Sequence, residues 1–227
     1  MALAAHDHRP LSRVETLGEL LASLGAAAAA GRAELAAMGK AQRRRPEGFI
    51  ADAVHFLTIL HGEMPSLLDA LAADNGDLED PLKQAAARFS DDRVWLAGLA
   101  ASSGIYPGLQ GLTSAETVVR NIRSAMLTLA RSQRDGCGLG VALGFLIDWP
   151  GLRAALDAAG AAVFAARWAA PAESWPGDAL LALTALAAPR FQEIGSRRAI
   201  AFGAGQFVQI HVELLELVET RAAVRRD

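Results

Sequence analysis

The 227-residue sequence is poor in cysteine, in aromatic residues and in net charge. Its single cysteine, Cys137, excludes an internal disulfide framework and a cysteine-rich zinc module, and it suits a reducing compartment. Aromatic residues make up only 6% of the chain, which disfavours a β-sandwich or a β-barrel. The formal net charge of −3 argues against a nucleic-acid partner, because proteins that bind the phosphate backbone carry a basic surface.

The sequence also lacks a targeting signal and a membrane-spanning run. The most apolar stretch, residues 137–147, is about half as long as the roughly 20 residues that a bilayer requires. Where a signal peptide would need an apolar core, the N-terminal segment carries four polar residues: His6, Asp7, His8 and Arg9. We therefore expect a soluble, cytoplasmic protein that has no membrane partner. Its twenty arginines against two lysines are typical of a GC-rich bacterial genome rather than of a particular function.

Alanine and leucine are what the sequence has most of, and together they make up more than a third of it. This mixture favours helices, and the apolar fraction of 52% is sufficient for a large core. We find no alternating run, hairpin signature or internal repeat. The sequence predicts an all-α, single-domain bundle of about seven to eight helices over residues 12–224, after a disordered tail over 1–11. The segment near 137–147 is apolar on every side and is expected to be a buried central helix.

Capping residues and prolines predict where several helices begin and end. Pro65 is expected to kink one helix that runs roughly from Glu47 to Ala73. Residues 148–151 are expected to form a turn after the buried helix, and the last helix is expected over about 196–224. Three segments carry the signature of a helix start: Ser12–Glu15, Asp80–Pro81 and Thr113–Glu116. In the last of these, the capping box accounts for Glu116 without a catalytic role.

Glycines recur around the start of the buried segment. They do not match a dinucleotide-binding loop, because the third glycine of that motif is missing and a predicted helix precedes them rather than a strand. We interpret them as small residues that allow close packing between helices. Small residues near the start of the last helix predict the matching contact. The two sets are Gly136, Gly138, Gly140 and Gly144, and Ala199, Gly203 and Gly205.

Three polar residues share one face of the helix predicted after Glu47. At about 100° per residue, Asp52, His55 and Glu63 lie within roughly 80° of one another. Two carboxylates and an imidazole could hold a hard divalent metal. A carboxylate-bridged diiron bundle would need two Glu-x-x-His pairs, and this spacing does not occur in the sequence. The alternative is a partly exposed Asp/His pair near a helix start.

Two further histidines are candidates for a buried site. His61 precedes the Pro65 kink, so its side chain could bond a freed backbone carbonyl or border a ligand pocket. His211 lies in the apolar stripe of the last predicted helix and is expected to point toward the core, where a neutral imidazole needs a hydrogen-bond partner. Each of the two is either a satisfied core histidine or a residue that binds a ligand or moves a proton.

Four short segments stand out in the middle half of the chain: His61–Pro65 followed by Asp69, Glu116–Arg123, Arg134–Gly140, and Asp148–Trp149. They resemble segments of an uncharacterised all-helical family of alphaproteobacteria, a domain of unknown function. The resemblance implies an α-helical fold and no known activity. This chain lacks two further histidines that the family carries at the positions of Met64 and Ser124, so a metal site of that family would be incomplete here. Size and helix count also resemble those of ferritin-like and heme-oxygenase-like bundles.

These observations leave the function unknown and indicate no particular cofactor. One hypothesis is a helical bundle without catalysis that acts as a homodimer, another homo-oligomer or a partner-binding protein. The alternative is a metal- or small-molecule-binding enzyme of ferritin-like or heme-oxygenase-like type, with its site inside the bundle. Its candidate residues are Asp52, His55, His61, Glu63 and His211. The alternative gains if His61 or His211 meets a carboxylate from another helix around a cavity, and it loses if each histidine bonds a backbone carbonyl in a dry core.

Overall fold

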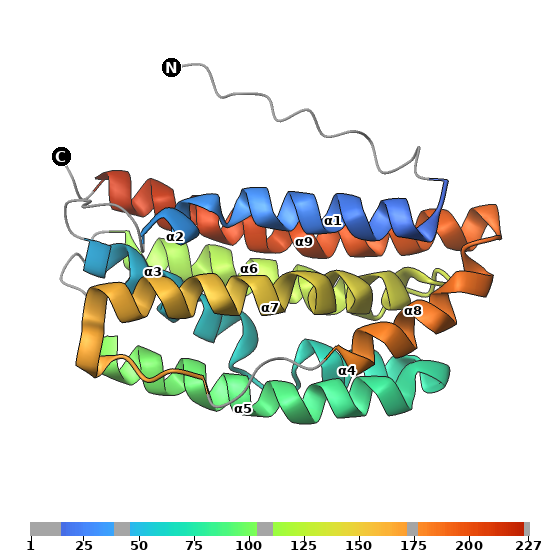
Figure 1. Cartoon of the computed structure of the whole chain (residues 1–227), viewed down its shortest axis with the longest axis horizontal. Coiled ribbons are helices and arrows are strands. Elements are labelled where there is room, and N and C mark those ends of the chain that lie inside the picture. The colour runs from blue at the N-terminus through green and yellow to red at the C-terminus, as the bar shows by residue number, and fades with distance from the viewer. Residues whose placement is uncertain (1–14, 39–45, 104–110, 172–176, 225–227) are drawn as a thin grey trace, which may run out of the picture.

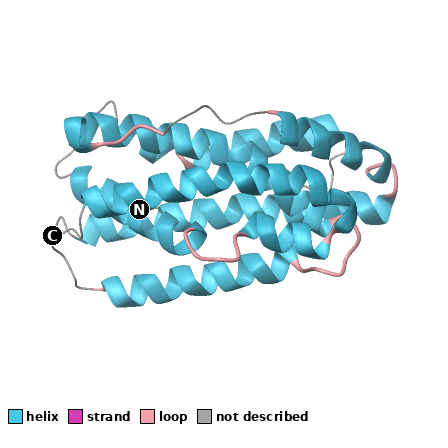
Figure 2. Ribbon diagram, turned by 90° about the horizontal axis from the view of Figure 1, so that it is seen from below, coloured by secondary structure: helices cyan, strands magenta, loops and turns pink. Residues whose placement is uncertain are grey.

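The computed structural model describes residues 15–38, 46–103, 111–171 and 177–224. Every regular element in these ranges is helical, and Figures 1 and 2 show no strand in them. The all-α prediction is confirmed, and eight of the nine α-helices in the described ranges have seven or more residues. The helices are α1 (Leu17–Gly31), α2 (Ala33–Met38), α3 (Pro46–His61), α4 (Leu67–Asp74), α5 (Glu79–Ser103), α6 (Leu112–Ala130), α7 (Cys137–Phe164), α8 (Asp178–Arg190) and α9 (Ile194–Val224), with 3₁₀ turns η2 (Gly76–Leu78) and η3 (Ala165–Arg167). The predicted tail over 1–11 lies outside the described residues, and the single domain over 12–224 stays a prediction.

The helices lie in three layers, with α7 in the middle one (Figure 1). Helices α1, α2 and α9 form one outer layer, and α4 and α5 form the other. Between them, α7 lies with α3 and α6, and α8 contacts α5, α7 and α9. Within the described ranges α7 is the one helix that is long and apolar enough to cross a membrane, and it is mostly buried by its neighbours, as the core helix of a soluble protein is. The predicted buried central helix is confirmed.

Helices α7 and α9 form the most extensive helix pair, and glycines bring their backbones together. A Cβ on Gly140 would lie 2.1 Å from the carbonyl oxygen of Ile200. A Cβ on Gly203 would lie 2.3 Å from the carbonyl oxygen of Cys137. No side chain fits at such distances, so the predicted close packing of small residues is confirmed between these two helices.

The expected turn over 148–151 is wrong, because α7 continues through Pro150 to Phe164. A proline inside a helix removes one backbone hydrogen bond and costs about 3 kcal/mol. Trp149 and Leu152, on either side of the proline, are almost completely buried. Their packing in the core holds the helix together, since tertiary burial contributes more to helix stability than local propensity does.

The segment predicted as one kinked helix is two helices. Helix α3 ends at His61, and α4 begins at Leu67 with a capping box between Ser66 and Asp69. In this box, Oγ of Ser66 accepts from the backbone N–H of Asp69 at 3.2 Å. The sequence signal at Pro65 therefore marks a break and not a kink, because Ser66 supplies a separate helix start.

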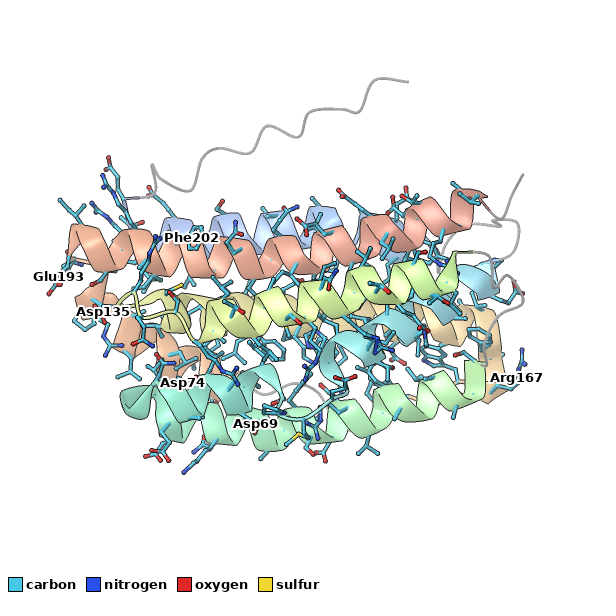
Figure 3. All side chains as sticks on the ribbon, turned by 180° about the vertical axis from the view of Figure 1, so that it is seen from behind. Asp69, Asp74, Asp135, Arg167, Glu193 and Phe202 are labelled. Atoms are coloured by element: carbon cyan, nitrogen blue, oxygen red, sulfur yellow. The ribbon has the colours of Figure 1, made fainter. Side chains whose placement is uncertain are left out.

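Other helix starts differ from their predictions, and one agrees. The capping box of α1 is Thr16 with Glu19, whereas Ser12 lies outside the described residues. Helix α6 begins after Gly111, whose φ is +75°, without a side-chain cap, so the box predicted at residues 113–116 is wrong. Helix α5 begins at Glu79, one residue before the predicted cap. The start of α9, expected near Ser196, is confirmed, and there Oγ of Ser196 donates to Asp135 at 2.7 Å, at the end of the bundle shown in Figure 3.

Candidate functional site

Two histidines that are 150 positions apart in the sequence meet inside the bundle. His61 is the last residue of α3 and His211 lies in the middle of α9, and each is only 2% exposed. Their Nε2 atoms are 2.8 Å apart, which is a hydrogen-bond distance. The prediction that His211 points toward the core is confirmed.

The second nitrogen of His211 contacts a buried carboxylate from α7. Nδ1 of His211 lies 2.7 Å from Oδ2 of Asp148, and Nη1 of Arg32 lies 3.0 Å from the other oxygen, Oδ1. Arg32 follows α1 directly and approaches α7 where Gly151 leaves room, because a Cβ there would lie 2.5 Å from Nη2 of Arg32. The result is a continuous hydrogen-bonded chain through Arg32, Asp148, His211 and His61, which we call the histidine chain.

One arrangement of the protons satisfies every hydrogen bond of the histidine chain with neither histidine charged. A carboxylate only accepts hydrogen bonds, so Nδ1 of His211 carries a proton and donates it to Asp148. Nε2 of neutral His211 is then an acceptor, and Nε2 of His61 is the donor that faces it. Nδ1 of His61 is therefore an unprotonated nitrogen with a free lone pair. It is buried and has no hydrogen-bond partner within the described ranges.

Aromatic rings surround the end of the histidine chain. His61 makes edge contacts with Phe89, Phe145 and Trp149 at centroid distances of 5.6, 6.0 and 5.4 Å. Burial lowers the pKa of His61 well below the usual histidine value of 6.5, and repulsion by a positive charge on His211 or on Arg123 lowers this pKa further. His61 is thus a neutral base at pH 7, in a largely apolar environment.

A second buried polar group fixes one of these rings. Asp92 of α5 is 1% exposed and accepts from the indole N–H of Trp149 at 2.7 Å. Its other oxygen accepts from Nε of Arg153 at 2.8 Å. Because Trp149 contacts His61, the Asp92 carboxylate determines the position of one wall of the site.

The loop after α3 is exposed, and an arginine of α6 holds it. Residues Glu63, Met64 and Pro65 are exposed, although His61 itself is buried. Arg123 of α6 holds this loop, because its Nη2 donates to the backbone carbonyls of Glu63 and Pro65 at 3.1 Å each. The buried His61 is therefore followed directly by an exposed loop that Arg123 holds.

The structure does not bring the three predicted metal ligands together. Oδ2 of Asp52 accepts from Nε of Arg221 at 2.9 Å, and Nε2 of His55 lies 2.8 Å from Oε1 of Glu116. The Glu63 carboxylate is near arginines of α6 instead. Across the described part of the chain, no three His, Cys, Asp or Glu side chains are placed to hold a metal ion.

Glu116 therefore has a tertiary partner in His55, although the sequence assigned it to a capping box. Sequence reasoning also missed Asp148, Arg32 and Asp92. The signal for Asp148 was present, because a carboxylate inside an apolar helix needs a polar partner. The predicted turn at that position concealed this signal.

Comparisons with known proteins add a family but no activity. A model of a family of unknown function, DUF6975, matches residues 24–226. No curated protein matches the chain, and no solved structure matches it. The match confirms the predicted resemblance to an uncharacterised all-helical family, and it extends well beyond the middle half of the chain.

Proposed function

The chain belongs to DUF6975, a family of unknown function, and we propose that it binds a small, mainly apolar molecule inside the bundle and accepts a proton from it at His61. The observation that carries this proposal is the unpartnered Nδ1 of His61 at the end of the histidine chain. A buried polar atom without a partner is costly, by about 1–3 kcal/mol. A ligand with an N–H or O–H group would satisfy it.

The arrangement behind His61 supports proton transfer as well as binding. When Nδ1 of His61 takes a proton from the ligand, the proton on Nε2 of His61 can move to Nε2 of His211, 2.8 Å away. His211 then carries the positive charge beside the carboxylate of Asp148. The ligand is left as its conjugate base, so each proton and each charge has a defined place.

Two observations favour this function over a purely structural role. Neither histidine is bonded to a backbone carbonyl, and His211 meets a carboxylate from another helix. The contacts of His61 with aromatic rings would suit an apolar ligand body. A metal-dependent reaction has less support, because His61 and His211 offer two nitrogens and the nearest carboxylate, Asp148, is already shared by two partners.

We propose the cytoplasm as the place of action, because a single cysteine suits a reducing compartment. The predicted homo-oligomer stays a prediction, because it concerns contacts between chains.

Phenol and anisole test the proposal as a matched pair of probes. Phenol carries an O–H donor on an apolar ring, and anisole replaces that hydrogen with a methyl group. In protein with ¹⁵N-labelled histidine, we expect Nδ1 of His61 to be unprotonated. The ¹⁵N chemical shift of this atom should change when phenol is added but not when anisole is added. The His61→Phe variant should lose phenol binding. His55→Gln, which changes a half-buried histidine on the same helix, should keep it. A proton found on Nδ1 of His61, or no response to phenol, would overturn the proposal.

A further inference from the structure

We infer that the ligand of this site is a small apolar carboxylic acid, held between Nδ1 of His61 and the guanidinium group of Arg123. The inference rests on the proposed function and specifies the polar group of its ligand. It starts from a second buried polar atom that has no hydrogen-bond partner in the described part of the chain, Nε of Arg123.

Arg123 lies against the loop that begins directly after His61. Its side chain is 14% exposed, and its Nη2 is occupied by the backbone carbonyls of Glu63 and Pro65. The Oε2 atom of Glu63 lies 3.7 Å from its Nε, which is too far for a hydrogen bond. The buried N–H of Nε is therefore available to a ligand that enters beneath the loop.

The two unpartnered atoms are complementary in chemistry. Nδ1 of His61 is an acceptor and Nε of Arg123 is a charged donor. A carboxylic acid carries a hydroxyl and a carbonyl on one carbon, so its O–H can face His61 while its carbonyl oxygen accepts from Arg123. An alcohol or a phenol satisfies only one of the two. An apolar body would lie against Phe89, Phe145 and Trp149.

The charges around the site favour this ligand in both of its protonation states. When the acid proton moves to Nδ1 of His61, the carboxylate that remains pairs with the positive charge of Arg123. The ligand O–H bond breaks and an N–H bond forms, and no other reactant is needed. The charged and titratable groups on the elements around His61 are Arg123 on α6, His211 on α9, Asp148 on α7, Arg32 after α1 and Asp92 on α5.

Benzoate is the probe, and proton uptake is the diagnostic measurement. At pH 7 free benzoate is ionised, so binding as the acid, or as carboxylate beside a protonated histidine chain, takes up about one proton. Calorimetric titrations in two buffers with different ionisation enthalpies measure the number of protons taken up when benzoate binds. The affinity should fall about tenfold per pH unit above neutral pH, as one-proton linkage requires.

Arg120 provides a matched control for Arg123. Both belong to α6 and both lie within 4 Å of the Glu63 carboxylate, but the Arg120 side chain is 55% exposed. We expect Arg123→Gln to weaken benzoate binding by about ten- to a hundredfold, the usual effect of one charge-assisted hydrogen bond. Arg120→Gln should change it less than about threefold. Arg123→Lys keeps the charge but lacks the Nε donor, so it should also weaken binding, and it serves if Arg123→Gln does not fold.

The outcomes separate this inference from the proposed function. Phenol binding at His61 without benzoate binding would overturn the carboxylic acid and leave the proposed function in place. Benzoate binding without proton uptake, or with equal sensitivity to both arginine variants, would also overturn it. If neither probe reaches His61, the proposed function fails as well.

Discussion

Replacing Asp148 by asparagine should reverse every hydrogen bond in the histidine chain. Arg32 only donates, so the amide oxygen of the new side chain must face it. The amide NH₂ group then faces Nδ1 of His211, which must become an acceptor. His211 consequently carries its proton on Nε2 and donates it to His61. His61 moves its own proton to Nδ1 and ceases to be a base at that atom.

The stability change follows from the two bonds that lose their charge. Hydrogen bonds to charged groups contribute about 1.5–3 kcal/mol and neutral ones about 0.5–1.5, so the His211 bond, which becomes neutral, loses roughly 1 kcal/mol. The Arg32 bond keeps its charged donor but loses the opposite charge of the carboxylate, an ion pair that contributes up to about 1 kcal/mol. The bond from the fully buried His211 loses the larger share, because the Arg32 side chain is 20% exposed and is partly screened by solvent. We expect a loss of about 2 kcal/mol in the free energy of unfolding. With a urea m-value of about 2 kcal/mol/M, the midpoint should fall by about 1 M.

The assay combines urea unfolding with NMR of ¹⁵N-labelled histidine. Asp52→Asn is the control, because Asp52 is also a buried carboxylate bonded to an arginine but does not contact His61 or His211. It should lose stability without changing the protonated nitrogen of either histidine. The reasoning is refuted if Asp148→Asn leaves the proton of His61 on Nε2, or if Asp52→Asn moves it.

Three further predictions concern the same core. Because burial, His211 and Arg123 lower the pKa of His61, the unfolded chain binds a proton below pH 6.5 that the folded chain does not. This histidine should therefore reduce the free energy of unfolding by up to about 1.4 kcal/mol per pH unit as pH falls below 6.5. Urea unfolding at several pH values would contradict this if the free energy of unfolding of His61→Gln fell with pH as steeply as that of the unchanged protein. Gly140→Ala should destabilise by about 1–3 kcal/mol, because its Cβ would overlap α9. Gly98→Ala, with open space around its Cβ, should stabilise the protein by up to about 1 kcal/mol. Thermal melts in which both variants shift the melting temperature in the same direction would refute the close helix contact. Asp92→Leu removes a carboxylate from a buried ion pair and should cost about 3–5 kcal/mol; a loss below 1 kcal/mol in urea unfolding would show that the pair does not hold the core.

The parts of the fold that were predictable depend on patterns along one segment. The buried helix was visible because residues 137–147 are apolar on every side, and α9 was visible as a stripe that includes His211. The glycine contact between α7 and α9 was predictable because small residues recur in both segments. In each case the property belongs to a single helix, so spacing within that helix is sufficient to show it.

The histidine chain was not predictable because its members come from separate parts of the sequence. His61 and His211 are 150 positions apart, and Arg32 and Asp148 are 116 apart. Periodicity showed that His211 faces the core, but it did not show which helix lies opposite. The same holds for the pair of His55 with Glu116, which needs the contact between α3 and α6.

Two errors of prediction came from relying on local motifs, and the error at the buried Asp148 points to a better way to find such sites. Asp148 was assigned to a turn and Glu116 to a capping box because each fits a local motif. Local motifs contribute about 1 kcal/mol, whereas leaving a carboxylate buried without a partner costs several times more. A charged residue in a segment that is otherwise apolar on every side is therefore better explained by a distant partner than by a nearby motif. Applied to residues 137–148, this rule selects Asp148 and requires that a donor from another part of the chain reach it, as His211 and Arg32 do.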